Sequence, residues 1–347
     1  MVCAGIILPI IVLRTEQVRQ DGSDLCLVRH PGYGCAFSVS KPMIKKITFL
    51  TFFVAGLIGG IESVLAQSAR KSGTPLHIEH DQQAGTLSVF RAGEKAPILT
   101  QNARKDTRPY LHPIVAPDGK GLLTEYRPKH HLHQTGLYWG LKLVNGRDYF
   151  MNWQGDYYRR VSARVLSKKG GEVKWQTVYD LIDEKGTTIL TETQNWSMRE
   201  QDGKYLLDLE WKGKAHIDIN LGKFYVGGLF VRMPWKPGDQ GEVVNAVGQK
   251  NKEAEGQRAI WTDVGIQVEG REDLAHIAMF DHPDNRAFPT PWRVDNELGV
   301  GPSVQILGDW KIEKGQTETI RYRLVVYTGD LKNANLTQEW KEFVRAY

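Results

Sequence analysis

Cysteine is scarce in this sequence of 347 residues. Its three cysteines, Cys3, Cys26 and Cys35, all lie near the amino terminus. Residues 67–347 therefore contain no thiol, which excludes a cysteine nucleophile, a disulfide bond or a thiolate metal ligand from most of the chain. Whatever chemistry this part performs must come from other side chains.

The sequence also lacks the short motifs of several large enzyme classes. It has no glycine-rich phosphate-binding loop, no Gly-x-Ser-x-Gly turn and no His-Glu-x-x-His helix. No nucleotide cofactor is therefore expected. The formal net charge of +5 is spread along the chain without a basic stripe, so no nucleic-acid partner is expected either.

Long hydrophobic runs are missing except for residues 47–61, which follow a short positive segment that begins at Met43. A cleavage-like stretch of small residues precedes Gln67. The apolar run is shorter than the ~20 residues that span a bilayer. We therefore predict a signal peptide at 43–66, an over-extended gene start at 1–42, and a mature chain without a membrane span. A secreted chain without disulfides fits the bacterial periplasm.

Strand-like alternation runs through the rest of the chain. In residues 204–211, for example, every second side chain is large and apolar, as in a strand with one buried face. Only residues 335–344 have helical spacing, with Asn335 as a candidate N-cap. We predict an all-β fold in which residues 67–347 form one large antiparallel β-sandwich with a short C-terminal helix. A super-sandwich of mutarotase-like architecture is one such fold, by analogy alone.

A histidine-rich stretch, YRPKHHLHQTGLYWG, occupies residues 126–140. If it is extended, His131 and His133 share one face and His130 points to the other. Two imidazoles ~7 Å apart on one strand face can bind a metal, hold an anion or exchange protons with a substrate. The residues alone leave these three alternatives open.

A second polar stretch lies about 150 residues later and reads DHPDNRAFPTPWR, residues 281–293. Its prolines stiffen a loop that is poorly suited to a core but well suited to a polar site. We expect the two stretches to meet in one site. Its expected catalytic residues are His131, His133, Asp281 and His282, and its expected substrate-binding residues are His112, Trp139, Asn285, Trp292 and Arg293.

These stretches also carry a resemblance. FDHPDNRAFPTPWRV, RPYLHPIVAPDG, the histidine-rich stretch and VNGRDYF resemble a family of secreted bacterial proteins labelled methane oxygenase PmoA-like. The resemblance implies a β-sandwich and a carbohydrate-utilisation context. A membrane methane monooxygenase subunit would need several transmembrane helices, which this sequence lacks. The family tends to read Asp-His-Pro-His-His where this chain has residues 130–134, so His131 and His133 match while His130 and Gln134 depart.

Two classes of function follow. The first is a secreted carbohydrate-processing enzyme, a hydrolase, lyase or epimerase, in which His131 and His133 bind a divalent metal or act as an acid–base pair. The second is a non-catalytic carbohydrate-binding protein that uses tryptophan platforms. The expected platforms are Trp139, Trp153, Trp261 and Trp292. The sequence leaves the substrate and the bond acted on open.

Overall fold

The computed structural model describes residues 73–308 and 310–347. These residues belong to one unit of the chain, Ala66–Tyr347. The expected gene-start segment 1–42 and the expected signal peptide 43–66 lie outside the described residues. Within the described part, no helix has the length and apolar character needed to cross a membrane.

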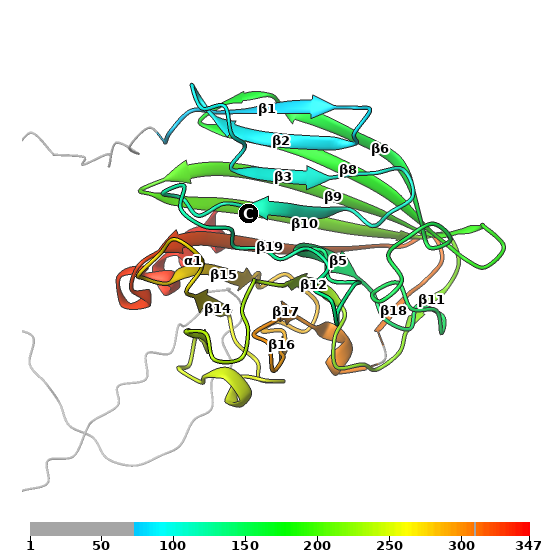
Figure 1. Cartoon of the computed structure of the whole chain (residues 1–347). Helices are drawn as coiled ribbons and strands as arrows, with labels where there is room; N and C mark the ends of the chain where they lie inside the picture. Colours follow the sequence, from blue (N-terminus) through cyan, green and yellow to red (C-terminus); the bar gives the residue numbers. More distant parts are fainter. Residues whose placement is uncertain (1–72, 309) are drawn as a thin grey trace, which may run out of the picture. The chain divides into compact units, whose positions relative to one another are not determined.

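Two large antiparallel sheets form the fold (Figure 1). The nine-stranded sheet contains, in spatial order, β16 (Trp292–Val294), β17 (Val300–Pro302), β12 (Gly228–Val231), β5 (Leu137–Gly140), β4 (Tyr110–Ile114), β3 (Leu99–Asn102), β2 (Thr86–Arg91), β1 (Leu76–Asp81) and β7 (Lys169–Gly170). The eight-stranded sheet contains β13 (Gly241–Asn245), β14 (Trp261–Ile266), β15 (Ala275–Asp281), β19 (Thr317–Thr328), β10 (Lys204–Ala215), β9 (Thr188–Gln201), β8 (Glu172–Ile182) and β6 (Tyr158–Ser167). The predicted all-β sandwich is thereby confirmed.

Shorter elements complete the fold. A two-stranded sheet pairs β11 (Ile219–Leu221) with β18 (Trp310–Ile312). Three single-turn 3₁₀ helices, η1 (Asn251–Glu253), η2 (Val304–Ile306) and η3 (Leu331–Asn333), lie in the connections.

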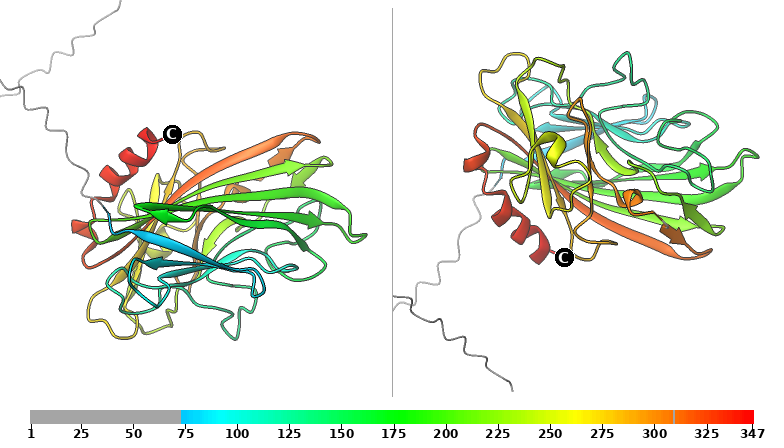
Figure 2. Two further views of the ribbon diagram at one scale, coloured as in Figure 1. Left: turned by 90° about the horizontal axis from the view of Figure 1, so that it is seen from above. Right: turned by 90° about the horizontal axis from the view of Figure 1, so that it is seen from below.

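The main core lies between the two large sheets. In β8 and β9 nearly every second side chain is buried, which is the period-2 pattern of strands with one covered face. From the opposite sheet, Trp139 on β5 lays its ring on that of Trp211 on β10, with centroids 4.4 Å apart. This aromatic stack joins the two layers, which lie one above the other in Figure 2.

The outer face of the eight-stranded sheet is covered by α1 (Leu336–Arg345), the predicted C-terminal helix. Leu336 and Phe343 of α1 belong to one buried cluster with Phe280 of β15 and Val325 of β19. Asn335 occupies the N-cap position, but its side chain makes no capping hydrogen bond. The helix therefore forms mainly because its apolar stripe is buried on the sheet.

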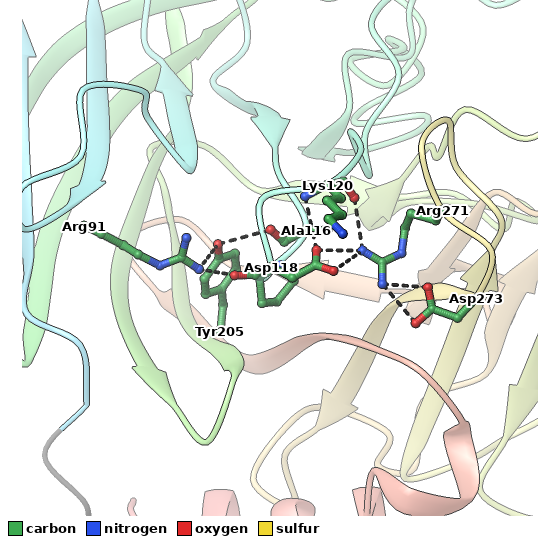
Figure 3. A network of polar contacts seen from close by, with 8 residues as sticks. Arg91, Ala116, Asp118, Lys120, Tyr205, Arg271 and Asp273 are labelled. Atoms are coloured by element: carbon green, nitrogen blue, oxygen red, sulfur yellow. Dashed lines mark hydrogen bonds and ion pairs between the residues drawn. The ribbon is translucent and has the colours of Figure 1, made fainter.

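A polar network ties one end of the two sheets together (Figure 3). Arg91 of β2 donates to Glu200 of β9 at 2.7 Å and to the hydroxyl of Tyr205 of β10 at 2.9 Å. Arg271 is held between Asp118 and Asp273, at 2.6 and 2.7 Å. These contacts join loops that are far apart in the sequence.

One prediction concerns the buried pair that joins β10, β19 and α1. Arg323 donates twice to Asp208, at 2.5 and 2.8 Å, and its guanidinium lies over the ring of Phe343 at 4.9 Å. Arg323→Met leaves a buried carboxylate without its main partner, so the free energy of unfolding should fall by about 3–5 kcal/mol. Urea denaturation measures this change. Lys174→Met, which breaks the exposed pair with Glu172, should change it by less than about 1 kcal/mol. Equal effects in the two variants would contradict the packing described.

Candidate functional site

Residues 128–134 of the histidine-rich stretch form two consecutive turns, so the alternation that an extended backbone would give does not apply to the three histidines. The amide of His131 donates to the carbonyl of Pro128 at 2.8 Å, and that of Gln134 donates to the carbonyl of His131 at 2.9 Å. The only aliphatic side chain among these positions, Leu132, is exposed. Without an apolar buried face, nothing fixes a strand register, and the segment forms a loop between β4 and β5.

The loop nevertheless brings His131 and His133 together in a pocket, called here the histidine pocket. Its volume is about 120 Å³. Its walls come from the histidine loop, the end of β5, the loop at residues 148–151, the segment before β12, and β16 with the turn that follows it. The lining residues are His131, His133, Gln134, Lys142, Phe150, Met151, Tyr225, Val226, Phe230, Arg293 and Asp295.

Strand alternation explains why the pocket lies on the outer face of the nine-stranded sheet. On β5, Trp139 belongs to the main core, whereas Tyr138 joins a separate buried cluster with Phe230 of β12. On β16, Trp292 is in the main core, and Arg293 lines the pocket. Successive side chains point to opposite faces, so an inward tryptophan places the next residue outward.

The same alternation corrects the expectation that Trp139 and Trp292 bind a ligand. Both rings are buried in the core, with exposed fractions of 1% and 0%. The Trp292 indole N–H donates to the carbonyl of Ala259 at 2.8 Å. Trp153 and Trp261, at 8% each, are also buried. None of the four expected platforms offers an open ring face.

His133 is the buried histidine of the pocket. It is 9% exposed, and neither ring nitrogen hydrogen-bonds to a described residue. Burial lowers the pKa of His133 to about 4, and the positive charge of Arg108 adds to the effect. The imidazole is therefore neutral at pH 7 and can accept a proton or a hydrogen bond.

Gln134, next to His133, is also without a partner. It is 3% exposed, and its carbonyl oxygen has no hydrogen-bond partner among the described residues. Buried polar groups are nearly always satisfied by protein or solvent. The unpartnered Gln134 oxygen, beside the uncommitted ring of His133, indicates a surface built to bind something polar.

Arg108 fixes the shape of the pocket from beneath. Its guanidinium donates at 2.6 Å to the carbonyl of Phe150 and at 2.6 Å to that of His133, and it lies 3.8 Å from the ring centroid of Tyr138. Arg108 is fully buried. Arg108 hydrogen-bonds to the loop that carries His133 and to the loop that carries Phe150. The positions of these two side chains therefore depend on Arg108.

Two further charged residues, Lys142 and Asp295, line the pocket but were missed in the sequence. Lys142 pairs with Asp148, whose other oxygen accepts the amides of Phe150 and Met151 at 2.9 and 3.0 Å. The segment VNGRDYF, which contains Asp148, entered the sequence analysis only through the family resemblance, and nothing in the sequence indicated its contact with Lys142.

Asp295 lies in the turn between β16 and β17, where its Oδ1 accepts the amides of Glu297 and Gly299 at 2.9 and 2.7 Å. Its Oδ2 makes no hydrogen bond to a described residue, and is left for a ligand. Asp295 comes two residues after Arg293, so the predicted polar stretch stopped just short of it.

The structure changes the expected metal ligands. His131 and His133 face each other edge to face, with ring centroids 5.7 Å apart. Among the described residues, the group that could hold a metal is instead His130, His131 and Glu297, whose ligand atoms all lie within 4.8 Å of one another. His130 Nε2 is 2.8 Å and His131 Nδ1 is 3.5 Å from Glu297 Oε2. His130, the histidine considered least relevant from the sequence, is thus part of the cluster.

An arginine already neutralises this cluster. The guanidinium of Arg232, which is 2% exposed, pairs with Glu297 Oε2 and with Glu125 at 3.3 Å. A hydrogen bond with His130 and the positive charge of Arg232 outweigh burial and hold the pKa of Glu297 below its usual value. A metal on the same oxygen would have to share it with Arg232.

Asp281, His282 and Asn285 do not line the histidine pocket, so the expectation that they complete one site with the histidines is wrong. Asp281 is fully buried and accepts the Asn285 amide and the Thr290 N–H, each at 2.7 Å. The Asn285 side chain bonds the main-chain N–H and C=O of Arg321, at 2.7 and 2.6 Å. The motif therefore extends the β15–β19 ladder and fixes the loop that leads to Arg293.

His282 packs away from the pocket, under the end of the chain. Its ring lies edge-on to Phe343 and Tyr347, at 5.2 and 5.6 Å between centroids. Burial lowers the pKa of His282. The arrangement gives this histidine a packing role at the α1 interface.

His112 lies in a different hollow, a cleft of about 970 Å³ that also contains Tyr126 and Arg271. Its Nδ1 is 3.0 Å from the Thr124 hydroxyl, and its ring stacks on Tyr126 with centroids 5.5 Å apart. Burial lowers the pKa of His112. Of the nine residues expected in one site, the histidine pocket therefore unites His131, His133 and Arg293.

The structure thus defines the class of the protein. It is an all-β sandwich that carries, on its outer face, a pocket lined by histidines, cations and a carboxylate. A family of unknown function (DUF6807) matches residues 89–341, and the chain belongs to this family. No curated protein matches the chain.

Among solved structures, the chain is similar to a GH36 alpha-galactosidase AgaB from Geobacillus stearothermophilus, with 9% identity over 73% of this chain and 41% of that one and a TM-score of 0.40. An alpha-galactosidase from Lactobacillus brevis gives 10% identity, 75% and 40% coverage, and a TM-score of 0.30. A galactose mutarotase related enzyme from Lactobacillus acidophilus gives 7% identity, 73% and 97% coverage, and a TM-score of 0.28. The chain spans about two-fifths of the length of the alpha-galactosidases. Likenesses at this level carry no argument about function.

The second prediction concerns the charge state of His133. Because its pKa is lowered to about 4, His133 should stay neutral at pH 7 and gain its proton only as the pH falls toward 4. Lys142→Met removes a nearby positive charge and leaves Asp148, so the pKa of His133 should rise. The shift of its Cε1–H signal in an NMR pH titration measures both. An unchanged midpoint in Lys142→Met, or a wild-type midpoint near 6.5, would refute the described environment.

Proposed function

We propose that the protein is a secreted carbohydrate-processing enzyme that performs acid–base chemistry in the histidine pocket. The observation that carries this proposal is the placement of His133, whose ring nitrogens make no hydrogen bond to a described residue, beside the unpartnered carbonyl oxygen of Gln134 in a pocket that also holds Arg293 and Asp295. A bacterial periplasmic location and a place in the PmoA-like family belong to the same proposal. They rest on the sequence alone.

His133 takes the role of general base. It is neutral at pH 7, reachable from the pocket, and not committed to any hydrogen bond with the described protein. Asp295, with its unbonded Oδ2, accepts a hydrogen bond from a substrate hydroxyl. His131, at the rim, is placed to exchange protons with His133 or with solvent.

The apolar lining suits a sugar ring. Phe150, Val226 and Phe230 provide buried apolar surface, and Tyr225 is 56% exposed at the edge of the pocket. A pyranose has apolar C–H faces and polar edges, so it matches a wall of this kind combined with a few fixed polar groups. The reaction is a hydrolysis, an elimination or an epimerisation, each of which needs a positioned base.

Non-catalytic carbohydrate binding is the second candidate, and Tyr225 favours it. The Tyr225 ring is the exposed aromatic among the residues that line the pocket. It could therefore serve as the stacking platform that was expected of the tryptophans. A binding protein would retain its affinity when His133 is replaced but lose it in Tyr225→Ala.

The third prediction tests the enzyme directly. The full-length protein is incubated with a panel of mono- and oligosaccharides in D₂O, and ¹H NMR follows deuterium uptake, elimination and hydrolysis in one experiment. His133→Gln should lower the turnover of any active sugar by about 10²–10⁴-fold, because it removes the base. His77→Gln on β1, outside the pocket, is the matched control and should leave the rate unchanged. Sugar binding without turnover in the wild type would instead favour the binding protein.

A divalent cation is a separate candidate for the rim of the pocket, and the fourth prediction addresses it. Two imidazoles and a carboxylate form a ligand set that suits zinc and similar ions. If a cation binds, His131→Ala and Glu297→Gln should each abolish stoichiometric zinc binding in isothermal titration calorimetry. His133→Gln should retain it. Zinc binding that depends on His133 but not on Glu297 would contradict this ligand set.

A further inference from the structure

Positive charge is concentrated around the inner part of the histidine pocket. Lys142 and Arg293 line it, and Arg108 lies directly beneath it. Lys142 is paired with Asp148, and Arg293 with Glu255. Arg108, by contrast, has no ion-pair partner among the described residues. Its described hydrogen bonds go to uncharged oxygens, those of Phe150, His133 and Thr135.

A fully buried cation without a counterion is costly, because removal from water is not offset by an opposite charge. The buried carboxyl that senses Arg108 is Glu192, and it compensates only partly. Burial raises the pKa of Glu192 to about 7, so this group is only partly ionised at neutral pH. Its oxygens are occupied by Gln194 and Trp211, at 2.7 and 2.9 Å.

These charges act electrostatically on His133 inside the pocket. Arg108, His131 and Lys142 all act to lower the pKa of His133, after burial, and the opposing contribution of Asp148 is smaller. Arg108, whose charge no described ion pair offsets, therefore favours an anion next to this imidazole.

Arg293 can supply the direct contact. Its bond to Glu255 uses Nη1, and its guanidinium lies 4.9 Å from the ring centroid of Tyr225. Its Nε and Nη2 make no hydrogen bonds to described residues, so these donors are available for a ligand. Two parallel N–H donors of a guanidinium match the two oxygens of a carboxylate.

Asp295 gives the pocket a preference for hydroxyl groups, in addition to the preference of the cations for an anion. A carboxylate with an unbonded oxygen accepts hydroxyl groups and repels anions. A ligand that satisfies both ends must carry hydroxyls and one acidic group. The volume of about 120 Å³ holds a group of monosaccharide scale rather than a drug-sized ligand.

We propose that the histidine pocket recognises an acidic sugar, a uronate whose carboxylate is bound by Arg293 and Lys142 and whose hydroxyls face Asp295. This inference rests on the proposed function and names its substrate class.

The fifth prediction tests this preference by isothermal titration calorimetry with the full-length protein. The probes are D-glucuronate and D-galacturonate, their neutral counterparts D-glucose and D-galactose, and D-glucose 6-sulfate. A uronate should bind at least about tenfold more tightly than its neutral counterpart, and the preference should shrink at high salt. Arg293→Gln should abolish the preference, and the matched control Arg286→Gln, whose exposed side chain contacts Glu318 outside the pocket, should retain it.

Asp295→Asn should change uronate affinity in the opposite direction to Arg293→Gln. A folding defect would weaken binding in both variants, so the comparison separates recognition from misfolding. Removing the negative charge of Asp295 should strengthen uronate binding, while the amide oxygen can still accept the Glu297 and Gly299 amides.

The outcomes separate the two proposals. Equal binding of neutral sugars and uronates, with His133 signals shifted by both, overturns the acidic-sugar inference and leaves the carbohydrate enzyme standing. Preference for the 6-sulfate over both uronates overturns the carboxylate assignment. Binding of none of the sugars, with no turnover in the panel, overturns the proposed function itself.

Discussion

The stack of Trp139 on Trp211 is the interaction on which the site depends. It joins the two sheets at 4.4 Å between ring centroids and fixes which face of β5 is inside. Because side chains alternate along a strand, the burial of Trp139 turns Tyr138 outward, into the cluster with Phe150 and Phe230. The floor of the histidine pocket is thus set by a contact on the opposite side of the sheet.

The same principle operates on β16. The burial of Trp292 turns Arg293 toward the pocket, and the Asp281–Asn285 clamp holds the loop that leads there. The residues of the DHPDN motif therefore act on the site through the backbone. Their role is to bring Arg293 and Asp295 to His133, and they do not themselves touch the pocket.

Much of the fold could be predicted from the sequence, because strand alternation and turn residues act locally. The alternation in residues 204–211 and the apolar stripe of the C-terminal helix were both visible, and both elements formed. The Asn145-Gly146 turn also formed, with φ values of 50° and 87°. These signals need no knowledge of distant partners.

The site could be predicted only in part. The histidine stretch was singled out as a candidate, but its backbone could not be assigned, since polar residues without an apolar buried face do not specify a register. Trp139 and Trp292 were expected to bind a ligand because a flat ring suits either a core or a sugar, and only the packing of the opposite sheet decides between them. Lys142, Asp295 and Glu297 were missed because their roles arise from tertiary contacts.

The central claim is that the histidine pocket, and not the larger cleft at His112, receives a sugar. A crystal structure of the protein soaked with D-glucuronate tests it most directly. The account predicts density for the sugar between His133 and Arg293, with the carboxylate on the guanidinium and hydroxyls within hydrogen-bonding distance of Asp295. Sugar density confined to the cleft beside His112 and Tyr126, with the histidine pocket filled by solvent alone, would contradict it.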